Sequence, residues 1–415
     1  MPDRTARTRA LHAACALLLA GLVACAGGGA ERVEQGAPGA STSAPPADED
    51  GEPEAGDGGS AEADGGEPTA SWTSTTPEEA GLDVDALEAM AASAEAGGSE
   101  CLVVTKDGVI VGEWYWAGFD ERSEREVFSV TKSITSTLVG IAQDRGLLDL
   151  DDRASDYIEA WKGTPSEDVT IRNLVSNDSG RFQDFATDYI QMAMQSEDKT
   201  AFSIGLEQQH ERGTTWVYNN AAIQTLDEVL EVATGMPTGD FAEEALFEPL
   251  GMSTTMKRDA AGNTLVFMGA QASCRDLARF GLLFLRGGEW GGEQVVSAEW
   301  VAEATSPSQD LNEGYGFLWW LNRAAGGAAA GSEVATGAVA GGPTDGATAE
   351  ATGRTYAALG LYGQLVGVYP DAGVVATRLG AEKGPSGATF GLGELSAGVV
   401  QALRQDQDVV EDAVG

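Results

Sequence analysis

The chain has 415 residues, of which 65 are acidic and 25 basic, giving a formal net charge of −40 at pH 7. This length allows a large hydrophobic core and one or two structural units. A surface this negative repels nucleic acid and anionic lipid head groups, so we expect no nucleic-acid partner.

The N-terminal segment has the form of a bacterial export signal. Three arginines within the first nine residues precede an apolar run, 11–24, that is too short to span a bilayer comfortably. The run ends in Leu-Val-Ala-Cys, which resembles a lipobox. We therefore expect residues 1–24 to be a lipoprotein signal peptide and Cys25 to carry a lipid, anchoring an exported cell-envelope protein on the periplasmic or cell-surface side. Ordinary secretion with cleavage elsewhere is the alternative.

Composition then divides the rest of the chain. Residues 25–70 consist mainly of Gly, Ala, Pro, Ser, Asp and Glu without an aromatic residue, so we expect a disordered acidic tether. Trp72 marks the return of a folded composition, which we assign to residues 71–404, followed by an acidic tail, 405–415.

Two cysteines remain besides those of the signal and the lipid site. Cys101 and Cys274 could pair in an oxidising compartment, but sequence does not establish that they are close, so both states stay open. No cluster has the spacing of metal ligands, and we expect no metal and no cofactor.

Strand signals occur early and late, with helical periodicity between them. We expect a helix over 83–94 and two strands, 101–105 and 109–116, joined by a tight Asp-Gly turn. Helical patterns dominate 145–290, strands return at 315–321, 356–369 and 374–379, and a helix follows at 392–404. This order predicts one mixed sheet covered by helices, with a helical insertion at 145–290. The Gly/Ala-rich segment 324–353 is either a mobile lid or an insertion without function.

The central motif is Ser129-Val130-Thr131-Lys132, followed by an apolar run to Ala142. On a helix starting near Ser129, positions i and i+3 share a face, so the hydroxyl and the amine can meet. A neutral lysine can then take the serine proton. A helix N-terminus also favours a developing oxyanion. The alternative is an N-cap serine followed by a surface lysine.

Other base candidates are weaker. A second Ser-x-x-Lys, at Ser196–Lys199, has charged neighbours and no apolar run after it, so we interpret it as a solvated turn. His210 is the one histidine beyond the signal segment, and its polar surroundings favour a structural or solvated role. The negative charge of the chain raises the pKa of Lys132, so burial must outweigh it if Lys132 is the base.

Two further segments could complete a catalytic site. In Tyr218-Asn219-Asn220, the phenol could relay the serine proton to a leaving group, and Asn220 could donate to a substrate carbonyl. The glycines of Gly360-Leu361-Tyr362-Gly363 permit close approach of a ligand at a strand edge, where a backbone N–H could join that of Ser129 in an oxyanion hole. The alternatives are a surface tripeptide and a Gly-rich bend.

In this order and spacing, the three elements resemble the penicillin-recognising serine hydrolases. That superfamily includes class C β-lactamases, D-alanyl-D-alanine carboxypeptidases, family VIII esterases and 6-aminohexanoate-dimer hydrolases. The resemblance implies an α/β (α+β) protein of the β-lactamase/transpeptidase-like fold, with an antiparallel sheet flanked by helices. It implies Ser129 as nucleophile, Lys132 as base and Tyr218 as acid/base partner, with Ser129 and Leu361 N–H groups holding the oxyanion. Weaker matches lie at 170–175, 179–180, 246–252, 276–281 and 315–320.

One departure bears on the substrate. Penicillin-recognising members usually carry Lys or His, then Thr and Gly on the last active-site strand, whereas Ala358-Leu359-Gly360 stands here. The missing residues normally bind the substrate carboxylate, an ion pair worth about 1.5–3 kcal/mol. Arg354 could replace the charge. Gly-x-x-Gly-Gln here is nearer the 6-aminohexanoate-dimer hydrolase and esterase branch.

These observations predict an exported serine hydrolase that cleaves a small ester or amide through an acyl-enzyme. A DD-peptidase or β-lactamase acting on cell-wall-like substrates is one alternative. A catalytically inactive binding protein of the same fold is another.

Overall fold

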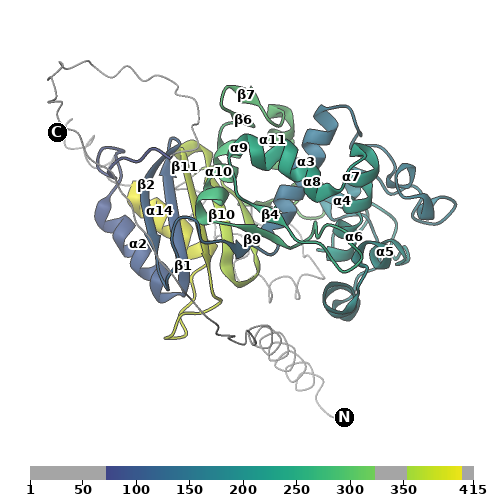
Figure 1. Cartoon of the computed structure of the whole chain (residues 1–415), viewed down its shortest axis with the longest axis horizontal. Helices are drawn as coiled ribbons and strands as arrows, with labels where there is room; N and C mark the ends of the chain where they lie inside the picture. Colours follow the sequence, from purple (N-terminus) through teal and green to yellow (C-terminus); the bar gives the residue numbers. More distant parts are fainter. Residues whose placement is uncertain (1–71, 323–352, 404–415) are drawn as a thin grey trace, which may run out of the picture. The chain divides into compact units, whose positions relative to one another are not determined.

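A six-stranded sheet lies at the centre of the fold (Figure 1), within residues 72–322 and 353–403, which the computed structural model describes. Its strands follow the order β2–β1–β11–β10–β9–β8, and all five neighbouring pairs are antiparallel. Early and late strands thus share one sheet as predicted, but the sheet is antiparallel, as the resemblance implied, and not mixed. The strands are β1 Ser99–Lys106, β2 Val109–Tyr115, β8 Trp320–Leu321, β9 Tyr356–Gly360, β10 Gln364–Tyr369 and β11 Val374–Gly380.

Helices cover both faces of this sheet. On one face α2 (Val84–Ala96) packs beside α14 (Leu392–Leu403), and on the other lie α3 (Val130–Asp144) and α10 (Cys274–Leu285). Side chains alternate between the two cores. In β1, Leu102 and Val104 point towards α2 and α14, whereas Cys101 and Val103 join the core on the α10 side. Burial on both faces explains why the central strands are almost continuously apolar.

Helices make up most of the regular structure in the segment predicted as a helical insertion, 145–290, and its last helix, α10, packs on the central sheet. It also contains short strands. The helices before α10 are α4 Ile171–Ser176, α5 Lys199–Ile204, α6 Asn220–Gln224, α7 Leu226–Thr234, α8 Thr238–Ala242, α9 Glu248–Leu250, the π-helices η3 Ala186–Gln195 and η4 Glu243–Phe247, and the 3₁₀ turns η1 Ala154–Asp156 and η2 Glu159–Trp161. The remaining elements are β3 Arg125–Glu126, β4 Thr255–Met256, β5 Ala270–Ala272, β6 Glu289–Trp290, β7 Glu293–Gln294, α11 Ala298–Ala304, and the 3₁₀ turns η5 Leu361–Gly363 and η6 Pro370–Ala372.

Local sequence signals account for several element ends. Asp83 caps α2 by accepting a hydrogen bond from the backbone N–H of Ala86. Asp107 and Gly108 both have positive φ angles, 51° and 88°, which is the backbone of the tight hairpin turn predicted between β1 and β2.

The strand prediction for 315–321 was too long. Only Trp320–Leu321 pairs in the sheet, because the preceding residues form a tight bend in which Leu318 has a φ of 59°. The N–H groups of Phe317 and Leu318 donate to the carbonyls of Ala304 and Val175 instead of to a neighbouring strand. Likewise, the predicted strand 356–369 is two strands, β9 and β10, joined by the turn η5.

Helix α3 is buried on every side over its first 13 residues, Val130 to Ala142. A helix in this position needs partners for its polar side chains. Ser133 donates to the carbonyl of Leu318 and Thr135 to that of Val266, so these hydroxyls tie α3 to the chain around it. The start of α3 is therefore rigidly placed.

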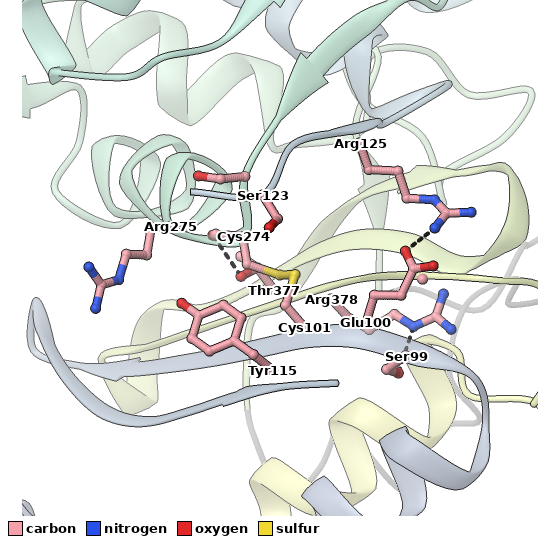
Figure 2. Close-up of a disulfide and its surroundings, with 12 residues drawn as sticks. Ser99, Glu100, Cys101, Tyr115, Ser123, Arg125, Cys274, Arg275, Thr377 and Arg378 are labelled. Carbon is pink, nitrogen blue, oxygen red and sulfur yellow. Dashed lines mark hydrogen bonds and ion pairs between the residues drawn. A yellow bond between two sulfur atoms is a disulfide. The ribbon is translucent and has the colours of Figure 1, made fainter. Parts of the chain in front are cut away.

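Cys101 and Cys274 form a disulfide (Figure 2), which answers the question that the sequence left open. It joins β1 to the first residue of α10 across 173 positions of sequence. Both sulfurs are buried beside Thr377, whose hydroxyl donates to the Cys274 carbonyl.

Several predicted segments lie outside the described residues: the signal peptide 1–24, the lipid site Cys25, the tether up to residue 70, most of the segment 324–353, and the tail 405–415. None of the helices in the described part of the chain has the length and apolar composition needed to cross a bilayer.

Candidate active site

Ser129 and Lys132 meet at the start of α3. Ser129 is the N-cap residue, and the Lys132 side chain follows one turn later, so that its Nζ lies 2.9 Å from Ser129 Oγ. The same Nζ lies 2.7 Å from the carbonyl oxygen of Phe267. This arrangement is the one expected from the i, i+3 spacing and lets the amine exchange a proton with the hydroxyl.

The amine of Lys132 is shielded from water. The residue is 1% exposed, and its Nζ lies 4.8 Å from the centre of the Tyr218 ring and 5.6 Å from that of Phe267. This burial lowers the pKa of Lys132 to about 7, although the negative charge of Asp188 acts in the opposite direction. Burial therefore outweighs the negative field, and a substantial fraction of the amine is neutral near pH 7.

Tyr218 joins this pair. A hydrogen bond with Ser129 lowers the pKa of the phenol, but burial dominates and raises it well above its usual value. The phenol is therefore a proton donor throughout the physiological range. Its ring stacks on Trp320 at 5.8 Å and meets Tyr315 edge-on at 6.3 Å, which fixes its orientation.

Asp188, in the π-helix η3, is a member of the site that the sequence did not reveal. Its carboxylate accepts hydrogen bonds from the backbone N–H of Ala221 at 2.7 Å and from Asn220 Nδ2 at 2.8 Å. Burial raises the pKa of Asp188 to about 6, opposed by these bonds and by the charge of Lys132. The side-chain amide of Asn220 thus donates to Asp188. The expected contact of Asn220 with a substrate carbonyl stays a prediction.

The segment that carries Leu361 approaches the segment that carries Ser129. At the end of β9, a Cβ on Gly360 would lie 2.2 Å from the carbonyl oxygen of Val127, so only glycine permits this contact. Leu361 follows at the first position of the turn η5. The two chain segments thus approach each other, and the pairing of the Ser129 and Leu361 N–H groups in an oxyanion hole stays a prediction.

Arg354 does not lie beside this site. Its guanidinium donates to the hydroxyl and the carbonyl of Thr305, at the end of α11. It lies two residues before β9 begins, and its guanidinium packs over the ring of Tyr356, 5.7 Å from the ring centre, at the end of β9 away from Gly360. Leu359, in the place of the usual hydroxyl residue, is buried. Arg354 is thus not a replacement for the missing cation.

The weaker base candidates do not form catalytic pairs. His210 is exposed. At the second Ser-x-x-Lys, Lys199 Nζ donates to the backbone carbonyl of Ser196, while the Ser196 hydroxyl donates to the carbonyl of Asp198. Across 72–322 and 353–403, no three His, Cys, Asp or Glu side chains gather as metal ligands.

Comparisons with known proteins show the family of the chain. A family model described as Beta-lactamase matches residues 86–390. The 6-aminohexanoate-dimer hydrolase of Paenarthrobacter ureafaciens is 25% identical over 221 residues, 49% of this chain and 56% of that protein. A β-lactamase of Pseudomonas fluorescens is 28% identical over 134 residues, 31% of this chain and 36% of that protein. The matched part thus spans about half, or less, of these relatives.

Solved structures share the fold. The crystal structure of a family VIII carboxylesterase superposes with a TM-score of 0.58 at 18% identity, covering 81% of this chain and 99% of that chain. At this identity the likeness establishes the β-lactamase/transpeptidase-like architecture, an antiparallel sheet flanked by helices.

Proposed function

Because this chain belongs to the Beta-lactamase family, we propose that it is a serine hydrolase that cleaves a small ester or amide through an acyl-enzyme. The observation that carries the proposal is the buried amine of Lys132, 2.9 Å from the Ser129 hydroxyl and with a pKa lowered to about 7. Nucleophilic catalysis by serine requires a neighbouring base with a pKa near 7 to take the hydroxyl proton.

In the proposed acylation, neutral Lys132 takes the proton of Ser129 as Oγ attacks the substrate carbonyl. The carbonyl oxygen becomes negative and accepts hydrogen bonds from the backbone N–H groups of Ser129 and Leu361. As the bond to the leaving group breaks, Tyr218 gives its phenolic proton to that group and regains a proton from Lys132. The acyl group then remains on Ser129.

In the proposed deacylation, water attacks the acyl carbonyl and gives up one proton to neutral Lys132, with the phenol of Tyr218 relaying it. The ester bond to Ser129 breaks, Oγ takes the proton back, and the carboxylic acid leaves. Each group returns to its starting state, so the Ser129, Lys132 and Tyr218 side chains suffice for the whole cycle.

We propose substrates without an essential carboxylate. Ala358 and Leu359 replace the usual Lys or His and Thr, and Arg354 is bound to Thr305 instead. This favours neutral esters and amides over penicillins or D-Ala-terminated peptides, by an ion pair worth about 1.5–3 kcal/mol. The family VIII carboxylesterase of like fold is in keeping with this preference.

We also propose that the protein is exported and anchored through Cys25 as a lipoprotein. The signal-like residues 1–24 support export, and so does the disulfide between Cys101 and Cys274, because such bonds persist mainly in oxidising compartments. Radiolabelled palmitate in a bacterial host, with Cys25→Ser as comparison, tests the anchor. The label should appear in the membrane fraction of the wild type alone.

A substrate panel tests the activity. The wild type, Ser129→Ala and the control Ser196→Ala are each given a chromogenic short-chain ester, a chromogenic cephalosporin and a D-Ala-D-Ala peptide. We expect the ester to be cleaved by the wild type and by Ser196→Ala, with loss in Ser129→Ala. Faster cleavage of the cephalosporin or the peptide would favour the cell-wall alternative. If nothing is cleaved and a fluorophosphonate does not label Ser129, the chain is an inactive binding protein.

A further inference from the structure

Two bulky residues beside the oxyanion donors have left-handed backbones. Phe128, which precedes Ser129, has a φ of 47°, and Tyr362, which follows Leu361, has a φ of 63°. A side chain with a Cβ and a ring rarely adopts this conformation. It persists where the surroundings hold it, and such positions cluster at functional sites.

The aromatic rings of Phe128 and Tyr362 are in contact. Phe128 and Tyr362 pack edge to face, with centroids 5.4 Å apart and planes at 86°. The contact bridges the chain segments that carry Ser129 and Leu361, so a movement of one donor is resisted by the other. The backbone approach of Gly360 to Val127 lies beside this contact and brings the same two segments together.

The turn alone does not call for a tyrosine. The three-residue turn Leu361–Gly363, between the paired residues Gly360 and Gln364, contains two consecutive positive φ values, 63° at Tyr362 and 78° at Gly363. Asn or Gly suits the first of these positions better. What the tyrosine adds is its ring against Phe128.

Arg378 holds the other side of the same turn. It lies on β11, is 0% exposed, and its Nη1 donates to the carbonyl oxygen of Tyr362 at 2.6 Å. Its remaining donors reach Ser99 Oγ at 2.9 Å, seen in Figure 2, and two further backbone carbonyls, those of Gly97 and Ala381. All of these acceptors are neutral, and within the described residues no carboxylate forms an ion pair with the guanidinium.

A buried guanidinium without a carboxylate is unfavourable for stability. Its desolvation lowers the pKa of Arg378 to about 10, which leaves the group charged at neutral pH. Its rigid fork of donors can nevertheless fix several carbonyls in one geometry, which a flexible lysine cannot do. One of those carbonyls belongs to the peptide that follows Tyr362.

We infer that Phe128, Tyr362 and Arg378 are positioning residues that hold the N–H groups of Ser129 and Leu361 towards one substrate carbonyl oxygen. The inference rests on the proposed function. An oxyanion hole is effective when both donors lie about 2.7–3.1 Å from the developing charge. The ring pair sets the separation of the two donors, and Arg378 sets the tilt of the turn.

The first test removes the ring and keeps the turn. Tyr362→Asn should lower kcat for a p-nitrophenyl ester about 10- to 100-fold and change KM less than about 3-fold, because the loss is felt in the transition state. Tyr362→Phe keeps the ring and should stay within about 2-fold of the wild type. Active-site titration with a fluorophosphonate corrects both values for unfolded protein. A Tyr362→Asn enzyme with wild-type kcat would overturn the inference.

The second test asks whether the rings act as a unit. Phe128→Leu and the double variant with Tyr362→Asn complete a mutant cycle. We expect kcat of the double variant to be no more than about 3-fold below that of the less active single variant. If the fold-decrease in kcat of the double variant equals the product of the two single decreases, the two residues act independently, which contradicts the inference.

The third test concerns Arg378. Arg378→Lys should weaken the binding of a boronic acid, which forms a tetrahedral adduct with Ser129, by about the factor by which it lowers kcat/KM, while leaving KM nearly unchanged. A merely structural role would lower the unfolding temperature but leave both values intact per titrated site. If Arg378→Lys does not fold, the Phe128 and Tyr362 variants alone test the inference. If the wild type neither cleaves esters nor reacts with the fluorophosphonate, both the proposed function and this inference are wrong. If the wild type is active and the variants are unaffected, only the inference is wrong.

Discussion

Replacing Lys132 by methionine should abolish activity and stabilise the protein at neutral pH. The pKa of Lys132 is about 7 in the folded protein against an ordinary 10.5, and a pKa difference of one corresponds to about 1.4 kcal/mol. Between these values the unfolded chain binds a proton that the folded protein does not, so the unfolding free energy of the wild type rises with pH. The burial of Lys132 therefore lowers the unfolding free energy by about 4 kcal/mol at pH 7 and by about 1 kcal/mol at pH 10.

The methionine variant lacks this penalty but leaves the Phe267 carbonyl without its partner. An unpaired buried carbonyl costs about 1–3 kcal/mol and does so at every pH. We therefore expect Lys132→Met to exceed the wild type by about 1–3 kcal/mol at pH 7 and to lose that advantage by pH 10.

Urea unfolding of both proteins from pH 7 to 10, under non-reducing conditions, measures the difference directly, since all other titrating groups are common to the two. Removal of the base should lower kcat/KM by at least about 100-fold, while Lys199→Met retains wild-type activity. A stability difference that stays constant from pH 7 to 10 would refute the reasoning, because Lys132 would then have an ordinary pKa.

Three further predictions follow from other buried groups. Asp188→Asn removes a charge that raises the pKa of the lysine, so the acid limb of the kcat/KM profile should move to lower pH, whereas Asp178→Asn should leave it in place. Cys274→Ser opens a loop of 173 residues and should lower the unfolding free energy by up to roughly 5 kcal/mol, measured by thermal unfolding without reductant. Burial raises the pKa of Asp227 to about 7, so the stability that it contributes is lost as pH rises from 4 to 7. Asp227→Asn should therefore stabilise the protein by about 1–4 kcal/mol at pH 8 and not at pH 4, as denaturant unfolding at the two pH values will reveal.

The parts of the site that sequence could predict are those set by local geometry. Ser129 and Lys132 are three residues apart on one helix, and that spacing alone brings their side chains together. Tyr218 and Leu361 could be assigned only through the family resemblance, because the fold brings them from distant parts of the chain.

Asp188 shows why the rest could not be predicted. It is a single acidic residue in a segment with no catalytic pattern, and its burial arises from contact with Asn220 and Ala221. It also lies in a π-helix, whose spacing the usual 3.6-residue periodicity does not describe. Arg354 shows the converse. It is close to Gly360 in sequence, but it lies beyond the far end of β9 and binds Thr305.

The bond between Cys101 and Cys274 also bears on how the protein is produced. Because it attaches the first residue of α10 to β1, and α10 packs on the central sheet opposite α2 and α14, chains made in a reducing bacterial cytoplasm would fold with two enclosed thiols in its place. Preparations from such a host and from an oxidising one would then differ in heat resistance while having the same mass to within two hydrogens. A thiol titration of each batch in denaturant, without reductant, would tell them apart before any rate is compared.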